Sequence, residues 1–168
     1  VAFDTRYRDL QKSVLDIGTG GFVTRNAAAA RSRGLELEAA WAPRADLRVG
    51  LSASWLDAEF TAFPGAKCPF GTPGFGVDGA ACDIRGYPLT PAPRFGGALT
   101  VDYERPLGAG LRLVGDLALL RRGSAYYQPS YNPLERQSGY TKVDLRAGIA
   151  AADDRWAATV LVRNATDV

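Results

Sequence analysis

The chain has no histidine and no methionine, and only two of its 168 residues are cysteines. Without histidine, the commonest general acid–base side chain and the commonest metal ligand are both missing. The net charge of +2 is too small to indicate a nucleic-acid partner. We therefore expect no enzyme, no resident cofactor or metal and no nucleic-acid binding.

Long apolar runs are also missing. A membrane-spanning helix needs roughly 20 consecutive apolar residues, so the sequence excludes a helical membrane protein. A β-barrel is not excluded, because each of its strands needs only about 9–11 residues, half of them polar. The first residues, from Val1 to Asp4, have neither the basic nor the apolar region of a signal peptide. We therefore expect the chain to be a piece of a longer protein.

Apolar and polar residues alternate in several segments, most clearly in residues 47–55. The odd positions of this segment are all apolar, and its even positions are Arg, Gly, Ser and Ser. The same pattern returns in residues 95–103 and 143–149. Since successive side chains of a strand point to opposite faces, each segment has one apolar and one polar face. The pattern predicts amphipathic β-strands.

The whole chain divides into about seven such strands. The expected strands cover about residues 1–15, a segment that starts after Phe22 and ends near 42, and residues 47–60, 93–103, 111–127, 139–150 and 155–163.

The connections between these strands alternate in length. Those at 43–46, 105–110 and 151–154 are tight, and those at 61–91 and 128–138 are long. By the same alternation the first connection should be long, although the glycines at 18–21 indicate a turn. Outer-membrane barrels have short periplasmic turns and long extracellular loops, whereas a Greek-key sandwich would not keep this regularity. We expect an all-β, antiparallel, up-and-down transmembrane β-barrel fragment.

Three aromatic residues, Trp41, Tyr103 and Trp156, each lie beside a tight turn on the apolar face of a strand. Such residues are typical of the aromatic girdle at a membrane interface, here on the periplasmic side. Alternatively they close the end of a soluble core. The apolar faces are rich in alanine and glycine, which fill a packed protein core poorly but are tolerated by lipid. This composition favours the girdle.

Cys68 and Cys82 are the two cysteines, and both lie in a stretch rich in glycine and proline. We expect a disulfide between them, which would indicate an oxidising compartment and, in the chain-entropy model, would stabilise a loop of about 15 residues by roughly 3 kcal/mol. Two free thiols or a zinc pair are the alternatives. The zinc pair is poorly supported, because the spacing is wrong and histidine is absent.

Four short segments resemble the TonB-dependent outer-membrane receptors. The matching segments, in order along the chain, are Asp9-Leu10-Gln11, residues 26–38 (NAAAARSRGLELE), residues 86–93 (GYPLTPAP), and residues 139–148 (GYTKVDLRAG) followed by 163–167 (RNATD). Each segment alone is a weak signal, but together they cover almost the whole chain in the right order.

This resemblance implies that residues 1–168 are the C-terminal portion of a plugged barrel of about 22 strands, without its plug domain and last strand. It implies a receptor in the outer membrane of a Gram-negative bacterium, in contact with outer-membrane lipid. Such receptors import a scarce ligand, most often a ferric siderophore, with energy from the TonB–ExbB–ExbD system delivered through the N-terminal part. The alternatives are a passive porin-type barrel and a soluble extracellular β-domain that binds ligand.

Ligand contacts are expected near the strand ends that carry the long connections. Arg121, Arg122, Tyr126 and Tyr127 combine positive charge with aromatic rings, which suits an anionic, aromatic iron chelate. The alternative is that they are ordinary residues of the upper girdle and the barrel lumen.

Overall fold

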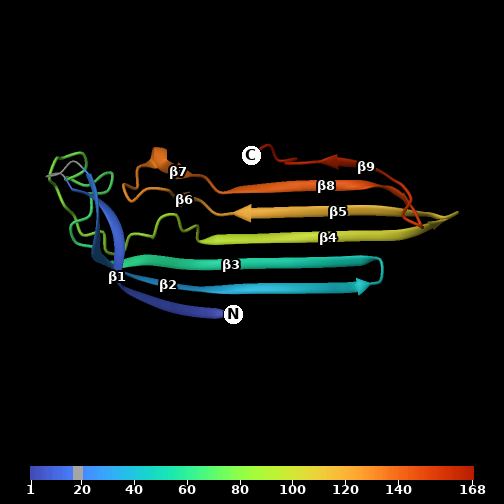
Figure 1. Cartoon of the computed structure of the whole chain (residues 1–168), viewed down its shortest axis with the longest axis horizontal. Helices are drawn as coiled ribbons and strands as arrows, with labels where there is room; N and C mark the ends of the chain where they lie inside the picture. The colour runs from blue at the N-terminus through green and yellow to red at the C-terminus, as the bar shows by residue number, and fades with distance from the viewer. Residues whose placement is uncertain (17–20) are drawn as a thin grey trace. The chain divides into compact units, whose positions relative to one another are not determined.

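The computed structural model describes residues 1–16 and 21–168, and its architecture is an antiparallel sheet of seven strands. The order across the sheet is β1-β2-β3-β4-β5-β8-β9, so each strand of this sheet pairs with the sheet strand that follows it in the chain (Figure 1). The strands are β1 (Ala2–Asp16), β2 (Gly21–Arg44), β3 (Leu47–Ala62), β4 (Phe95–Gly108), β5 (Leu111–Arg122), β8 (Tyr140–Ala151) and β9 (Ala157–Val162).

This order confirms the predicted up-and-down, all-β architecture. Within residues 1–16 and 21–168 the sheet is open, with β1 and β9 at its two edges. Open sheet edges expose unpaired backbone groups, which lipid does not tolerate. The sheet therefore requires further strands before it can span a membrane. No helix in the described part of the chain is long and apolar enough to cross a bilayer.

The chain forms two compact units. We call the first the loop unit, because it contains both long connections, and the second the hairpin unit, because it contains the tight turns. The loop unit consists of Val1–Leu35, Trp55–Arg94 and Ser124–Ser138, and the hairpin unit of Glu36–Ser54, Phe95–Gly123 and Gly139–Val168.

The hairpin unit is a single layer of paired strands. Asp102 of β4, Asp116 of β5 and Arg146 of β8 lie opposite one another in the register. The apolar neighbours Val101, Leu117 and Leu145 form the adjacent row, which continues to Val162 of β9. Polar and apolar rows therefore run across the strands on opposite faces.

The loop unit contains a packed core. Phe60, Phe63 and Ile84 are 1%, 4% and 0% exposed, and they cluster with two alanines of β2 and with Tyr131. In β3 the buried residues of this unit are Ala58 and Phe60, which share the face opposite to Asp57 and Glu59. The long connections therefore cover one face of the strand ends with apolar side chains.

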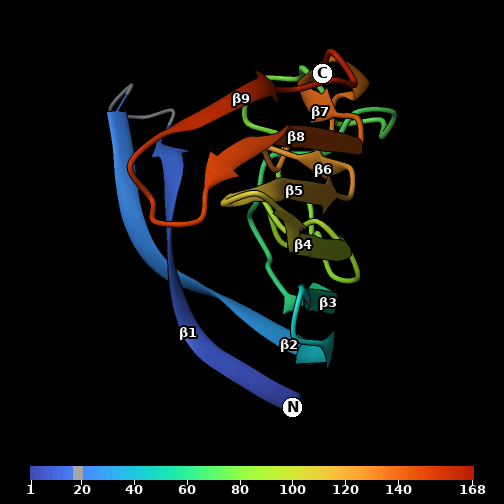
Figure 2. The ribbon, with the colours of Figure 1, turned by 90° about the vertical axis from the view of Figure 1, so that its right-hand side faces the viewer.

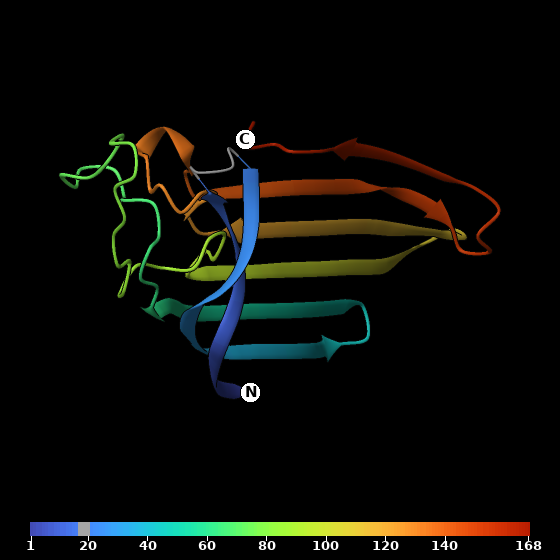
Figure 3. The same ribbon diagram turned by 60° about the vertical axis from the view of Figure 1, so that its left-hand side comes forward.

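A long strand pair and a small hairpin complete the loop unit. β1 and β2 pair from Ala2 and Leu35 to Asp16 and Gly21 (Figure 3). In the second long connection, β6 (Ala125–Tyr126) pairs with β7 (Arg136–Gln137) (Figure 2). A 3₁₀ turn, η1 (Pro133–Glu135), lies between them, and the Asn132 side chain caps it by accepting a hydrogen bond from the Leu134 N–H.

The expectation of a long first connection was wrong. Pairing of β1 with β2 continues to Asp16 and Gly21, so only residues 17–20 separate the two strands. Extended pairing satisfies the backbone groups that a loop would leave to water. The predicted glycine turn falls mainly on these four residues, which lie outside the described part of the chain.

Two strand ends also differ from the prediction. β4 continues through Pro106 to Gly108, with a register shift between these two residues, because proline is tolerated at a bulge. β5 ends at Arg122 rather than near residue 127, because Ala125 and Tyr126 pair with β7 in the separate small hairpin.

Candidate functional site

The apolar face of the hairpin unit is exposed along its strands. Trp41 is 66% exposed, Val160 71% and Leu145 43%. These values are high for large apolar side chains inside a regular sheet, and an exposed apolar surface of this extent marks a contact with lipid or with another protein. The apolar face is therefore the first candidate for a functional surface.

The opposite face of the hairpin unit carries ion pairs. The Arg146 guanidinium donates to the Asp116 carboxylate across the β5–β8 pair at 2.5 Å. Arg112 contacts Glu104 at 2.7 Å and also pairs with Asp154. An open hollow of about 560 Å³ lies on this face, with Arg48 and Asp102 among its lining residues. Charged side chains in the middle of strands suit a water-filled lumen.

In the loop unit the apolar row ends in charged residues. On β2 the exposed Leu35 is followed on the same face by Arg33 and Arg31, and on β3 the exposed Trp55 is followed by Asp57. Arg33 pairs with Asp57 at 2.7 Å, and Arg31 pairs with Asp4 of β1. A change from apolar to ion-paired residues along one face is the pattern expected where hydrocarbon gives way to the headgroup layer.

The three predicted girdle residues all lie in the hairpin unit. Trp41 is near the end of β2, Tyr103 is in β4, and Trp156 immediately precedes β9. Trp41 and Trp156 are 66% and 49% exposed, and Tyr103 is partly buried. Their ring surfaces are thus available to a lipid interface.

The four predicted ligand contacts divide between the two units. Arg121 and Arg122 end β5 in the hairpin unit, and Tyr126 and Tyr127 belong to the loop unit. Arg121 lies in the apolar row with Leu119 and donates to Thr141 Oγ1 at 3.1 Å. Arg122 pairs in register with Gly96 and Tyr140, so its side chain belongs to the polar face. Strand alternation therefore separates the two arginines onto opposite faces.

The two tyrosines have different surroundings. The Tyr126 ring packs edge-on against Tyr131 at 5.6 Å between centroids, and the Arg136 guanidinium lies 5.9 Å above it. Tyr127 is 46% exposed and its hydroxyl donates to Gln137 Oε1 at 2.6 Å. Together with Leu134 and Arg136, Tyr127 and Gln137 line an open hollow of about 550 Å³.

Tyr131 holds the two long connections together, a role that the sequence did not reveal. Its ring stacks against Tyr87 at 4.7 Å, and its hydroxyl donates to the Pro88 carbonyl at 2.6 Å. Burial raises the pKa of Tyr131, with a smaller contribution from Tyr87, so the hydroxyl stays a donor at neutral pH. Tyr87 lies in the first long connection, far in sequence from Tyr126 and Tyr131 in the second, and only the concentration of tyrosines in the connections could have indicated the cluster.

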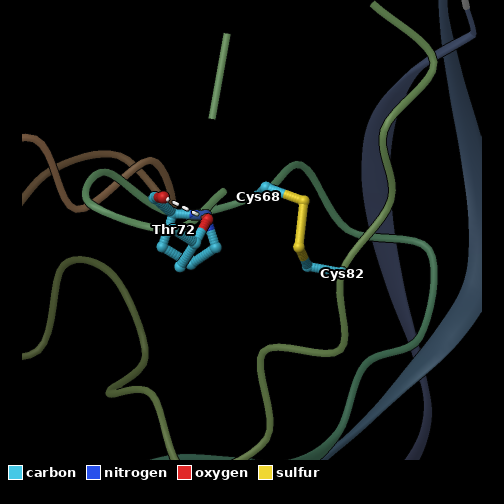
Figure 4. Close-up of a disulfide and its surroundings, with 4 residues drawn as sticks. Cys68, Thr72 and Cys82 are labelled. Atoms are coloured by element: carbon cyan, nitrogen blue, oxygen red, sulfur yellow. Dashed lines mark hydrogen bonds between the residues drawn. A yellow bond between two sulfur atoms is a disulfide. The ribbon is translucent and has the colours of Figure 1, made fainter. Parts of the chain in front are cut away.

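In the first long connection a disulfide joins Cys68 to Cys82, with 4.9 Å between the Cα atoms (Figure 4). Within the loop that it closes, the Thr72 hydroxyl donates to the Pro69 carbonyl at 2.7 Å, and Figure 4 shows this turn beside the disulfide. Ala66 and Cys82 exchange backbone hydrogen bonds of 3.0 and 2.9 Å. The segment is thus closed at its base by both covalent and backbone bonds. No group of residues suited to hold a metal ion is found in the described part of the chain.

Comparison with known proteins points to one family. The family model described as "TonB dependent receptor-like, beta-barrel" matches residues 1–165. Among solved structures, the chain is similar to the ferric yersiniabactin uptake receptor FyuA from Yersinia pestis, with a TM-score of 0.70 and 22% sequence identity. The alignment covers 99% of this chain and 22% of the FyuA chain, so this chain spans about a fifth of that receptor. A search of the curated proteins found no match.

Proposed function

This chain belongs to the TonB-dependent receptor β-barrel family, and from that premise we propose that it is the C-terminal part of the barrel of an outer-membrane receptor. The receptor imports a scarce ligand, a ferric siderophore, across the outer membrane of a Gram-negative bacterium. TonB, ExbB and ExbD supply the energy through a plug domain located elsewhere in the full receptor. The chain itself provides part of the lipid-facing wall and part of the ligand entrance.

The observation that carries this proposal is the division of the strands into two faces. The apolar row of β3 covers the nine residues from Leu47 to Trp55. A tilted transmembrane strand needs about 9–11 residues, so the two lengths agree. Beyond Trp55 the same face continues with ion-paired Asp57. A soluble domain would cover such a row with a second layer, whereas in the proposed barrel lipid covers it.

The lengths of the connections support an orientation. In the proposed barrel the tight turns lie at the periplasmic side and the long connections at the outside, as in other outer-membrane barrels. Trp41, Tyr103 and Trp156 then form part of the periplasmic girdle, and the long connections meet the ligand. Of the two arginines, Arg122 is the better candidate for a ligand contact, because Arg121 shares its row with apolar residues. In the loop unit, Tyr126 and Tyr127 remain proposed contacts.

The fold similarity to FyuA supports a receptor fold but leaves the ligand to experiment. The test is uptake of iron-55 presented as ferric chelates by cells that produce the full receptor, with and without a functional TonB. We expect uptake that requires both the receptor and TonB. Passage of chelates that is independent of TonB would instead indicate a passive porin and would contradict the proposal.

A further inference from the structure

The phenylalanines at the end of β3 and in the first long connection differ in exposure. Phe60 of β3 and Phe63 of the connection are 1% and 4% exposed and belong to the core of the loop unit. Phe70 and Phe75 are 50% and 39% exposed. Both exposed residues lie inside the loop that the Cys68–Cys82 disulfide closes. The loop unit thus buries two of these aromatic rings and leaves the other two exposed to solvent.

The two exposed rings form an ordered pair. Their centroids are 5.1 Å apart, with an angle of 71° between the ring planes, an edge-to-face arrangement. Both rings keep exposed surface in this pair, and Val77, 57% exposed, adds apolar surface in the same loop. An exposed aromatic pair on a soluble surface is costly unless it meets a partner.

The backbone that carries the pair is fixed at several points. The Phe75 N–H donates to the Thr72 carbonyl at 3.0 Å, and the Thr72 N–H donates to the Pro69 carbonyl at 3.1 Å. The Phe70 N–H donates to the Ser130 carbonyl of the second long connection at 2.7 Å. Gly74 lies so close to the disulfide that a Cβ atom there would approach Cys68 Sγ to 2.5 Å. A surface fixed before binding loses little entropy when its partner arrives.

We propose that Phe70 and Phe75 form a preformed contact site for an aromatic ring of the ligand, such as a phenolate or catecholate ring of a ferric chelate. This inference rests on the proposed function and deepens it. The two rings expose on the order of 200 Å² together, far below the roughly 800 Å² per partner that a stable protein–protein interface needs. An area of this size fits one or two rings of a small molecule, and an edge-to-face pair is the geometry that a third ring extends.

The test compares binding of two probes to the full receptor in outer-membrane vesicles. One probe is a ferric tris-catecholate chelate, and the other is a ferric trihydroxamate chelate without aromatic rings. The variants are Phe70→Ser with Phe75→Ser, and Phe70→Leu with Phe75→Leu, which keeps apolar area but removes the rings. The matched control is Thr61→Ala, since Thr61 is an exposed, uncharged residue near the end of β3 in the same unit and lines no hollow named above. Formation of the disulfide, checked by mass, shows that each variant keeps the loop.

We expect both double variants to bind the catecholate chelate about tenfold more weakly, with the serine variant the weaker of the two and the Thr61 variant unchanged. Unchanged catecholate binding in the serine variant would overturn the inference and leave the proposed function standing. Binding of the hydroxamate chelate alone by the unaltered receptor would do the same. If the double variants bind the chelate normally but no longer self-associate, the two rings contact a second copy of the receptor, and the inference is overturned. Binding of neither chelate would overturn the iron-chelate function and the inference with it.

Discussion

The two units of this chain differ in whether the apolar side chains of their strands are covered by the chain itself. In the loop unit, apolar side chains of the strands are covered by the chain's own connections, and Phe60 and Ile84 are almost completely buried. In the hairpin unit, Val160 and Trp41 remain exposed. The difference shows that strand alternation determines which side chains share a face, but a second layer of chain, or lipid, determines whether that face is buried.

The largest effect should come from the core of the loop unit. Phe60→Ala removes the ring at the centre of the cluster and should lower the free energy of unfolding by about 3–5 kcal/mol. Leu134→Ala, at a site 92% exposed in the same unit, should change it by less than about 0.5 kcal/mol. Denaturant unfolding of the full receptor in lipid vesicles measures both. Equal effects would mean that the loop unit has no core under native conditions.

In the hairpin unit, a charge introduced on the apolar face should lower the stability of the receptor more than one introduced on the opposite face. Val160→Arg places a guanidinium in the exposed apolar row of β9, and near the bilayer midplane this costs about 2–4 kcal/mol. Thr159→Arg, on the adjacent residue and the opposite face, should cost about 1 kcal/mol or less because the charge stays in water. The same unfolding experiment separates them. A Thr159 variant as damaging as the Val160 variant would contradict the assignment of the faces.

Removal of the disulfide should affect the loop unit alone. Replacing Cys68 and Cys82 by alanine frees a loop whose ends are 14 residues apart, and the chain-entropy model predicts a loss of up to about 3 kcal/mol. Hydrogen exchange should rise at Ala66 and Phe70, whose N–H groups donate to Cys82 and Ser130. Exchange in β5 and β8 should not change. Increased exchange throughout the hairpin unit would show that the two units unfold together.

The smallest effect is expected at a tight turn. The hydrogen bond from Arg44 lowers the pKa of Asp46 below its ordinary value of 3.8. The ionised carboxylate therefore contributes stability above the unfolded-state pKa, and this contribution is lost as the pH falls through the lower folded-state pKa. Asp46→Asn should make the receptor slightly less stable at neutral pH and less sensitive to acid below about pH 4. Measuring the free energy of unfolding between pH 2 and pH 7, roughly the window of carboxylate titration, would detect this difference. An unchanged acid profile would show that the Arg44–Asp46 pair does not contribute to stability.

The sequence predicted the hairpin unit better than the loop unit, for a physical reason. Tight turns and alternating rows are local features, so β8 and the start of β3 were predicted within a residue or two. The core of the loop unit depends on side chains from separate segments, such as Tyr87 and Tyr131, and no local pattern records that contact. The first strand was predicted to within about a residue, but the start of β2 at Gly21 was missed, because the residues that follow Phe22 do not alternate clearly.

The predicted ligand contacts show the same limit. Charge and aromatic character identified Arg121 and Arg122 together, yet adjacent strand residues point to opposite faces, so one arginine falls in the apolar row and the other on the polar face. The aromatic pair of Phe70 and Phe75 was missed because exposure cannot be read from residue type. Only the structure shows that these two rings are exposed while the neighbouring Phe63 is buried.

The central claim is that the exposed apolar row of the hairpin unit faces lipid. A nitroxide spin label at Val160→Cys and another at Thr159→Cys, in the full receptor reconstituted in vesicles, test it by collision with oxygen, which dissolves in lipid, and with a water-soluble nickel chelate. The account predicts strong collision with oxygen and weak collision with nickel at position 160, and the reverse at position 159. Strong collision with nickel at position 160 would contradict the account, because the apolar row would then face water.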